Sequence, residues 1–274
     1  FNLRIAKWAK KRGFKNHYYI SPQVWAWKEN RVKKMKRVLD ALYVILPFEK
    51  NYFEKRHQFP VHFVGHPIID QLHEYEKNNS FFEANNLKSK KPIIALLPGS
   101  RLQEIKKMLP LFIKVSTHYK KYQFLIAGAP GVEPEIYNKF IKSSPLKIIY
   151  GQTYDLLNNS LAAIVTSGTA TLETAIFNVP QIVCYKSSHL SYWIGKKIIN
   201  LKYISLVNLI LEKEAIVELI QNECKFEKLN YQLKRVLKKD SQEKINQDYQ
   251  LLKQKLGGVG ASEKTANLIF NALN

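Results

Sequence analysis

Cysteine is scarce in this sequence, which contains only Cys184 and Cys224 among 274 residues. Two cysteines provide neither the disulfide framework of a small secreted domain nor the ligands of a structural zinc site. We expect both to be buried or idle thiols in a reducing compartment. The sequence also lacks the roughly 18–20 consecutive apolar residues of a membrane-spanning helix. The nearest candidate, 198–211, is interrupted by two asparagines, a lysine and a serine, so we expect a soluble or peripheral protein.

Acidic residues are also few: 22 Asp and Glu face 43 Lys and Arg, which gives a formal net charge of +21. The basic residues are spread along the chain rather than gathered in a tail. Two interpretations stay open, namely solvated lysine-rich faces or an anionic partner such as nucleotide phosphates, a phosphorylated lipid or an acidic membrane. No zinc-finger spacing or aromatic RNA-binding signature occurs, so we predict no nucleic-acid partner.

Two common phosphate-binding motifs are missing. Neither G-x-x-x-x-G-K-[ST] nor G-x-G-x-x-G occurs, which disfavours ATP hydrolysis and dinucleotide redox chemistry. The sequence begins with Phe1 in a helical pattern that ends near Gly13 and lacks the apolar centre of a signal peptide. We therefore expect the sequence to start inside a longer protein.

What is present is an alternation of buried strands and helices, which predicts an α/β protein with parallel sheets. The expected strands are 17–21, 41–46, 61–65, 92–97, 123–128, 146–150, 161–166 and 181–185. The interpretation is two Rossmann-like domains, the first incomplete, plus a helical C-terminal segment. The predicted boundaries are 1–75 for the first domain, 76–91 for a linker, 92–187 for the second domain and 188–274 for the helical segment.

The stretch 96–101 ends one of these strands in the loop Pro98-Gly99-Ser100-Arg101. Ligands of open parallel sheets bind beyond the carboxyl ends of the strands. Gly99 would let the backbone approach a ligand, and Ser100 would cap the next helix, whose free N–H groups favour an anion. Arg101 adds a permanent charge that suits phosphate oxygens. The alternative is an ordinary capped turn with a surface arginine.

A second strand ends in the small-residue turn Ser167-Gly168-Thr169, and the following helix carries Glu173. Small residues would let a ligand lie against the start of the helix, while Glu173 would accept hydrogen bonds from a ribose diol. The alternative is that the turn only permits tight packing and that Glu173 is solvated. Together, the two loops predict a cleft for a nucleoside diphosphate.

The first domain contains Trp25 and Trp27 in a loop before the strongly basic stretch 31–37. This combination suits an acylated, phosphorylated substrate at a membrane surface. Tryptophans packed in a core beside a solvated helix are an equally good interpretation. His66 follows another strand and is either a polar contact in the cleft or a satisfied structural histidine.

The motifs "SPQVWAW", "LPFEKNYF", "VGHP", "LLPGSRLQEI" and "SGTATLE", in this order, resemble the bacterial lipid-A-disaccharide synthase family. The later "YISLVNLI" and "LIQNEC" fit the same pattern. The resemblance implies an inverting GT-B glycosyltransferase that needs no metal or other cofactor. Its substrates would be UDP-2,3-diacylglucosamine and 2,3-diacylglucosamine 1-phosphate, and its products lipid A disaccharide 1-phosphate and UDP. It also implies a cytoplasmic location, peripheral on the anionic inner membrane, and a homodimer with exchanged C-terminal segments.

The same resemblance implies roles for individual residues. Arg101, with the backbone of Gly99 and Ser100, would stabilise the leaving UDP. The nucleotide and donor site would contain Ser167, Gly168, Thr169, Glu173 and Asn208, although Val207 replaces the proline of the family's S-L-P-N motif. The acceptor or lipid side would contain Trp25, Trp27 and His66.

The family's general base lies in a "D-x-P-D" segment that would precede Phe1. The resemblance therefore implies that residues 1–274 bind UDP but form no disaccharide. Two other interpretations stay open: another GT-B enzyme acting on a UDP-sugar, such as an epimerase, or a basic binding module without catalysis.

Overall fold

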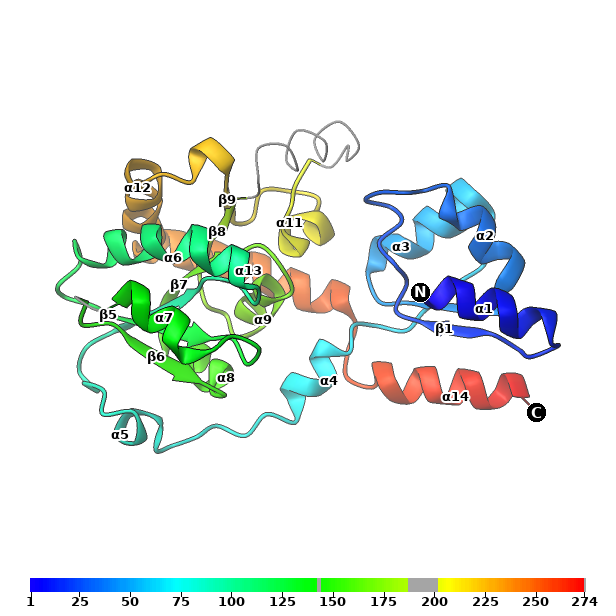
Figure 1. Ribbon diagram of the computed structural model, residues 1–274, viewed down its shortest axis with the longest axis horizontal. Helices are drawn as coiled ribbons and strands as arrows, with labels where there is room; N and C mark the ends of the chain where they lie inside the picture. The colour runs from blue at the N-terminus through cyan, green and yellow to red at the C-terminus, as the bar shows by residue number, and fades with distance from the viewer. Residues whose placement is uncertain (142–143, 187–201, 274) are drawn as a thin grey trace. The chain divides into compact units, whose positions relative to one another are not determined.

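Buried strands alternate with helices along most of the chain and form two separate parallel sheets (Figure 1). The computed structural model describes residues 1–141, 144–186 and 202–273. These residues divide into two units. Unit 1 holds 1–75 and 252–273, and unit 2 holds the described residues from 76 to 251. The C-terminal residues therefore return to the unit that contains the N-terminal ones.

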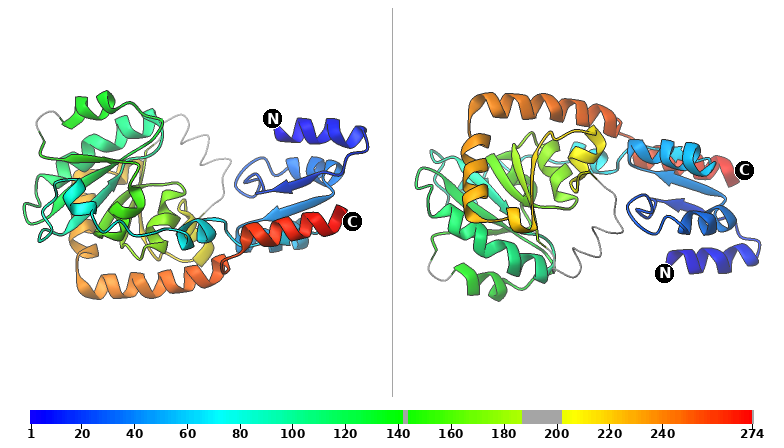
Figure 2. Two further views of the ribbon diagram at one scale, coloured as in Figure 1. Left: turned by 90° about the horizontal axis from the view of Figure 1, so that it is seen from below. Right: turned by 90° about the horizontal axis from the view of Figure 1, so that it is seen from above.

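Unit 1 contains a three-stranded parallel sheet in the order β1-β2-β3. Its elements are α1 (Asn2–Lys11), β1 (His17–Tyr19), α2 (Arg31–Val38), β2 (Ala41–Val44), α3 (Pro47–Asn51), the π-helix η1 (Tyr52–Arg56), β3 (His62–Phe63), α4 (Ile68–His73) and α14 (Ala261–Leu273). Leu42 and Val44 of β2 pack with Ala6 of α1 and Met35 of α2 in a buried cluster. Because side chains alternate along a strand, this cluster covers one face of the sheet. Figure 2 shows α14 along the other face.

The C-terminal helix α14 is attached to unit 1 of its own chain by polar contacts. The Asp70 carboxylate accepts hydrogen bonds from the backbone N–H groups of Gly260 (2.7 Å) and Ser262 (2.9 Å) at the start of this helix. Lys264 donates to the carbonyl oxygen of Phe63 in β3 (3.0 Å). These contacts lie within one chain. The exchange of this segment in a homodimer stays a prediction.

Unit 2 contains a six-stranded parallel sheet in the order β6-β5-β4-β7-β8-β9, with helices on both faces (Figures 1 and 2). Its strands are β4 (Ile93–Leu97), β5 (Gln123–Gly128), β6 (Lys147–Tyr150), β7 (Ser160–Thr166), β8 (Gln181–Tyr185) and β9 (Val217–Ile220). Its helices are α5 (Phe81–Ala84), α6 (Leu102–Ser116), α7 (Pro134–Ile141), α8 (Thr153–Asn158), α9 (Ala170–Ile176), α11 (Leu206–Leu211), the 3-10 helix η2 (Gln221–Glu223), α12 (Phe226–Val236) and α13 (Lys239–Leu256), whose last turn belongs to unit 1.

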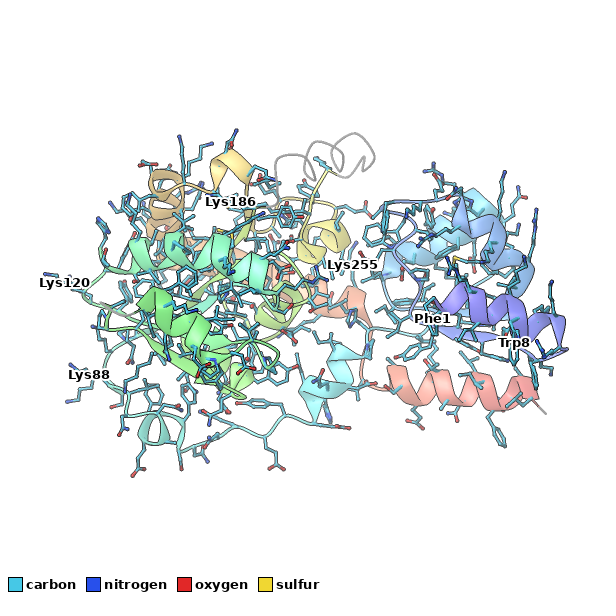
Figure 3. The ribbon with its side chains drawn as sticks, viewed as in Figure 1. Phe1, Trp8, Lys88, Lys120, Lys186 and Lys255 are labelled. Atoms are coloured by element: carbon cyan, nitrogen blue, oxygen red, sulfur yellow. The ribbon has the colours of Figure 1, made fainter. Side chains whose placement is uncertain are left out.

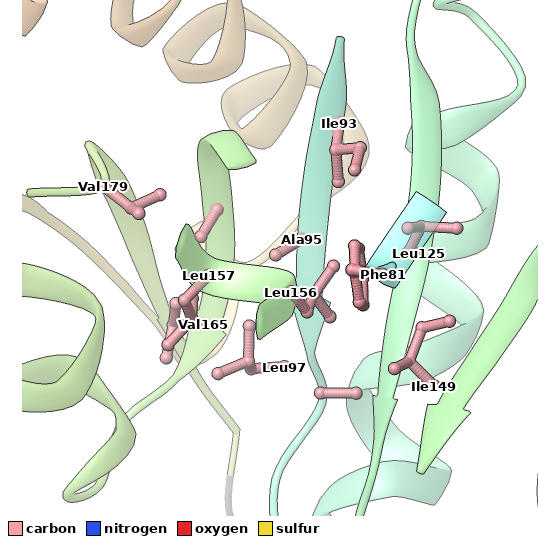
Figure 4. Close-up of a cluster of buried hydrophobic side chains, with 12 residues drawn as sticks. Phe81, Ile93, Ala95, Leu97, Leu125, Ile149, Leu156, Leu157, Val165 and Val179 are labelled. Atoms are coloured by element: carbon pink, nitrogen blue, oxygen red, sulfur yellow. The ribbon is translucent and has the colours of Figure 1, made fainter. Parts of the chain in front are cut away.

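One face of the larger sheet is covered by a cluster of apolar side chains (Figure 4). Ile93, Ala95 and Leu97 of β4 contribute to it, and Leu156 of α8 packs on them. Phe81 of α5 also belongs to this cluster and is fully buried. The stretch 76–91, expected to be a linker, therefore contains a helix that supplies a core side chain to unit 2.

The expected C-terminal helical segment is helical over most of its described length, with one exception. The expectation was wrong for β9, which pairs in parallel with β8 and places Leu219 opposite Cys184. The four residues of β9 have mixed polarity and show no clear hydrophobic period. The strand is therefore recognisable only from its pairing with β8. The part of the expected segment on 188–201 lies outside the described residues.

Candidate functional site

The two phosphate-site loops predicted from the sequence follow neighbouring strands. β4 and β7 pair in parallel with Leu97 opposite Val165, so both loops emerge at the same edge of the sheet. The chain proceeds from β4 through β5 to β6 on one side, and from β7 through β8 to β9 on the other. The strand order therefore reverses between β4 and β7, which is where open parallel sheets bind ligands. Residues 98–101 and 167–169 flank this point.

The first loop, 98–101, is closed by a side chain of its own helix. The Glu104 carboxylate accepts hydrogen bonds from the backbone N–H groups of Ser100 (3.1 Å) and Arg101 (3.3 Å). The predicted capping role of Ser100 was wrong, because residue 101 is the N-cap of α6 and Glu104 satisfies the donors beside it. Gly99 has a φ of +113°, and a Cβ atom there would lie 2.6 Å from the Glu104 Oε2 atom. The glycine is thus needed for the approach of Glu104.

The Arg101 guanidinium is exposed beside this loop. Its Nη1 atom lies 3.6 Å from Oε1 of Glu104, and 83% of its side-chain surface is accessible. An ion pair this exposed contributes little to stability. The guanidinium is therefore able to exchange the carboxylate for another anion.

The second loop, 167–169, is anchored to two other segments. The Ser167 N–H donates to the carbonyl oxygen of Cys184 in β8 (3.0 Å), and its hydroxyl donates to the carbonyl oxygen of Ile204 (3.2 Å). Gly168 and Thr169 are exposed, and a Cβ atom at Gly168 would meet no atom within 4 Å. The loop is therefore rigidly held at Ser167 and open at its tip.

Asn208 is linked through Glu218 to the backbone that Ser167 contacts, because the Glu218 carboxylate also accepts a hydrogen bond from the N–H of Ile204 (2.9 Å). Its side-chain amide donates to the Ile216 carbonyl oxygen and to Oε1 of Glu218, both at 2.8 Å. Its amide oxygen accepts from the N–H groups of Ala215 (2.9 Å) and Ile216 (3.0 Å). All four hydrogen-bonding positions of this buried amide are filled. In the structure the Asn208 side chain thus bonds to protein groups, and the donor-site role implied by the resemblance stays a prediction.

Glu173 lies in α9, one turn beyond the second loop. It is half-buried, and Tyr154 of α8 donates a hydrogen bond to its Oε1 atom (3.4 Å). Burial raises the pKa of Glu173, and the hydrogen bond from Tyr154 acts in the opposite direction. A half-buried carboxyl group with one phenol partner retains acceptor capacity for a further hydroxyl group.

In unit 1, the two tryptophans of the "SPQVWAW" loop have different surroundings. The Trp25 indole N–H donates to Oε1 of Glu49 (3.1 Å), and its ring packs edge-on against Phe48 with a centroid distance of 4.9 Å. Trp27 is 46% exposed, and the Lys28 ammonium lies 4.3 Å from its ring centroid. Trp25 thus fits the interpretation of a packed tryptophan. Trp27 fits the other interpretation, an exposed aromatic ring beside a cationic side chain.

Glu49 is the buried group that holds Trp25. Its Oε2 atom accepts hydrogen bonds from the N–H groups of Ile45 (3.2 Å) and Leu46 (2.9 Å). Only 1% of its surface is exposed. Burial raises the pKa of Glu49 to about 7, although the three hydrogen bonds favour the ionised form.

His66 is also buried, and its Nδ1 atom accepts a hydrogen bond from the N–H of Ile68 at the start of α4 (3.2 Å). Its backbone N–H donates to the carbonyl oxygen of Leu256 (3.0 Å). Burial lowers the pKa of His66 to about 4, so the ring is neutral near pH 7. These contacts support the structural interpretation of this residue.

The surface of both units carries many cationic side chains. Figure 3 shows Lys88 and Lys120 projecting from unit 2 and Trp8 on α1 of unit 1. Trp8 is 52% exposed, and the Arg12 guanidinium lies 4.1 Å from its ring centroid. Within the described ranges, no helix has the length and hydropathy of a membrane span, and no three His, Cys, Asp or Glu side chains are grouped as metal ligands.

A model of the family described as lipid-A-disaccharide synthetase matches residues 1–271. The chain belongs to this family. Curated relatives include the lipid-A-disaccharide synthases of Persephonella marina, with 38% identity over 98% of this chain and 74% of the relative, and of Sulfurihydrogenibium sp., with 35% identity over the whole chain and 75% of the relative. A relative from Coxiella burnetii is 39% identical over 82% of this chain and 60% of its own length. The family resemblance inferred from the motifs is confirmed.

Solved structures support the fold of this lipid-A-disaccharide synthase family member. A putative UDP-N-acetylglucosamine 2-epimerase from Listeria monocytogenes has a TM-score of 0.64 and 12% identity, covering 99% of this chain and 70% of that one. An S. aureus MnaA–UDP complex has a TM-score of 0.66 and 14% identity, with coverages of 98% and 70%. At these identities the likeness shows the fold alone. The predicted GT-B glycosyltransferase fold is confirmed.

Several residues that contact the predicted loops were not identified from the sequence. Glu104 stands three residues after the N-cap, the position of a capping-box acid, so its signal was present and was missed. Glu49 lies within "LPFEKNYF" as one acid among many. Tyr154 and Glu218 gave no local signal, because each meets its partner only when separate segments fold together.

Proposed function

We propose that this chain is the donor- and acceptor-binding part of an inverting hexosyltransferase. The enzyme would join UDP-2,3-diacylglucosamine to 2,3-diacylglucosamine 1-phosphate, giving lipid A disaccharide 1-phosphate and UDP. One observation carries the proposal: loops 98–101 and 167–169 follow adjacent strands at the point where the strand order of the sheet reverses. Membership of the lipid-A-disaccharide synthase family supports the choice of substrates.

The residues of the two loops have separate roles in this proposal. The backbone at Gly99 and Ser100 binds the pyrophosphate of UDP, and Arg101 neutralises the charge that develops on it as the sugar departs. Ser167, Gly168 and Thr169 line the nucleotide on the other side. The exposure of Arg101, Gly168 and Thr169 supports this assignment, because side chains and backbone that contact a ligand must be accessible without it.

Glu173 accepts hydrogen bonds from the ribose hydroxyl groups in this proposal. Its raised pKa and single phenol partner support the role, because a partly desolvated carboxyl group gains from a further donor. Asn208 acts indirectly in this proposal. It donates to Glu218, whose carboxylate also accepts from the N–H of Ile204, and the Ile204 carbonyl oxygen receives the Ser167 hydroxyl. Transfer with inversion requires a base on the acceptor hydroxyl, and no residue of this chain is assigned that role.

Unit 1 is proposed to bind the acylated acceptor near an anionic membrane surface. Trp27, with Lys28 beside its ring, offers an apolar contact with a cationic neighbour. Trp25 orders the same loop through Glu49. His66 supports the adjacent turn rather than contacting lipid. Peripheral attachment to the membrane and assembly into a homodimer are parts of this proposal.

Calorimetric titration of the 274-residue chain with UDP tests the donor site. We expect saturable binding that Arg101→Ala weakens roughly tenfold, the loss of one charge-assisted contact. Arg235→Ala is the matched control, because Arg235 is exposed on α12 and contacts Tyr231 and Gln232. Binding, rather than turnover, makes the result independent of the general base. No UDP binding, or equal binding by wild type and Arg101→Ala, would refute the proposal.

A competition experiment tests the choice of substrate. UDP-2,3-diacylglucosamine in detergent micelles should displace UDP at lower concentration than unacylated UDP-glucosamine does. Equal displacement by the two donors would indicate a different GT-B enzyme of UDP-sugars. Binding to anionic vesicles that does not change in Arg101→Ala, together with no UDP binding, would indicate a basic binding module.

A further inference from the structure

We propose that Glu104 is a placeholder in the donor site: its carboxylate occupies the phosphate-binding donors of the unliganded chain and leaves them when a nucleoside diphosphate binds. The inference deepens the proposed function and rests on it.

The contacts of Glu104 include two of the groups assigned to the pyrophosphate, the Ser100 N–H and the Arg101 guanidinium. One carboxylate oxygen, Oε2, accepts from the N–H groups of Ser100 (3.1 Å) and Arg101 (3.3 Å). The other, Oε1, lies 3.6 Å from the Arg101 guanidinium. Two backbone donors and one cation therefore converge on a single carboxylate, an arrangement that suits a phosphate group equally well.

The loop backbone is shaped for this carboxylate. Gly99 adopts a φ of +113°, and a Cβ atom there would lie 2.6 Å from Oε2 and 2.7 Å from the Cβ atom of Glu104. Any other residue at position 99 would displace the carboxylate from the loop. The space that admits Glu104 beside the backbone would also admit a phosphate oxygen once the carboxylate has moved.

The carboxylate and a phosphate cannot use these donors together. Each backbone N–H carries one proton, and two anions sharing them would repel each other at close range. The side chain of Glu104 is 25% exposed and lies in the first turn of α6, so rotation about its side-chain bonds takes it into solvent. Phosphate binding then exchanges one anion for another at a loop that is already ordered.

This exchange has two opposite consequences. Without ligand, Glu104 satisfies two N–H groups at the helix start and stabilises the loop. With ligand, displacing the carboxylate reduces the net affinity for the diphosphate. Removing the negative charge of Glu104 should therefore tighten phosphate binding while it loosens the empty loop. A residue that only capped the helix would give the opposite result, because a less ordered loop binds more weakly.

The experiment compares UDP binding to wild type and Glu104→Gln in the 274-residue chain by calorimetric titration. We expect Glu104→Gln to bind UDP about tenfold more tightly, since a neutral amide competes less well for the two N–H groups and does not pair with the guanidinium. Binding of uridine, which has no phosphate, should be the same in both proteins. Glu243→Gln is the matched control, because it removes one exposed carboxylate of α13 near Lys239, away from these donors.

A second variant separates occupation of the donors from net charge. Glu104→Asp keeps the charge but shortens the side chain by one methylene, so its hold on Ser100 should weaken and its UDP affinity should lie between those of wild type and Glu104→Gln. If Glu104→Asp matches wild type, or if Glu243→Gln also tightens binding, the effect belongs to net charge and the placeholder is refuted. Unchanged or weaker UDP binding by Glu104→Gln, with Arg101→Ala still impaired, refutes the placeholder but leaves the donor site standing. Equal binding by wild type and Arg101→Ala refutes both.

Discussion

Glu49→Gln should abolish a pH dependence of stability that comes from one buried carboxyl group in unit 1. Burial raises the pKa of Glu49 from its ordinary value of 4.5 to about 7. The folded chain therefore keeps a proton on Glu49 at pH values where the unfolded chain has lost it. Between pH 4.5 and 7 the folded state binds more protons, so the free energy of unfolding falls as the pH rises. The stabilising contribution is complete below pH 4.5 and is lost above pH 7.

The size of the effect follows from the two pKa values. Each pH unit across which the folded state holds one extra proton is equivalent to ~1.4 kcal/mol. Between pH 5 and pH 8, wild type should therefore lose about 2.5 kcal/mol of unfolding free energy through Glu49 alone. Glu49→Gln cannot ionise, so its unfolding free energy should lack this loss between pH 5 and pH 8. Solvent screens this effect little, because Glu49 is only 1% exposed.

Urea unfolding followed by tryptophan fluorescence measures this loss, because Trp8, Trp25 and Trp27 all lie in unit 1. The quantity of interest is the difference in unfolding free energy between wild type and Glu49→Gln at pH 5, 6, 7 and 8. Glu74→Gln is the control, since Glu74 is exposed in the same unit and its replacement should leave the pH profile unchanged. Parallel profiles for wild type and Glu49→Gln would show that the carboxyl group is not desolvated as described.

Two further substitutions test the contacts that the sequence did not reveal. Phe81→Ala should lower the unfolding free energy of unit 2 by about 3–5 kcal/mol, which is the cost of removing a fully buried phenylalanine. Phe82→Ala, at a half-buried position, should lower it clearly less. If calorimetry finds equally small effects for both variants, α5 is not part of the core. Asp70→Asn should weaken the attachment of α14 by roughly 1–2 kcal/mol, because the Gly260 and Ser262 N–H groups lose a charged acceptor. Amide hydrogen exchange in residues 261–273 should then become faster. Unchanged exchange rates there would contradict the role of this contact.

Much of the architecture was predictable because the strands of a parallel sheet are buried on both faces. Ile93 to Leu97 and Leu161 to Thr166 read as strands from their apolar character alone. Small residues and glycine after these strands indicated ligand loops. The predicted loops lie side by side in the structure. The strand β9 was missed because its pattern is mixed, and its assignment depends on pairing with β8.

The two loops of the candidate site were predictable in their position and less so in their contacts. Glycine at position 99 indicated a close approach to the backbone, but the sequence could not say that the approaching group is Glu104. Asn208 was identified as a polar residue of the donor motif, but the sequence did not show that its side-chain amide forms hydrogen bonds with Ile216, Glu218 and Ala215. Such partners depend on how separate turns meet, which no local pattern encodes.

The sequence by itself determined the family, the GT-B fold class and the position of the two loops that follow β4 and β7, because hydrophobic periodicity and loop motifs are local properties of the chain. Tertiary structure alone decided that Phe81 is a core residue, that α14 returns to unit 1 and that Glu104 holds the donors of the first loop. These facts depend on burial and on contacts between groups from different segments. A side chain becomes buried or hydrogen-bonded to a distant segment only when the chain has folded around it.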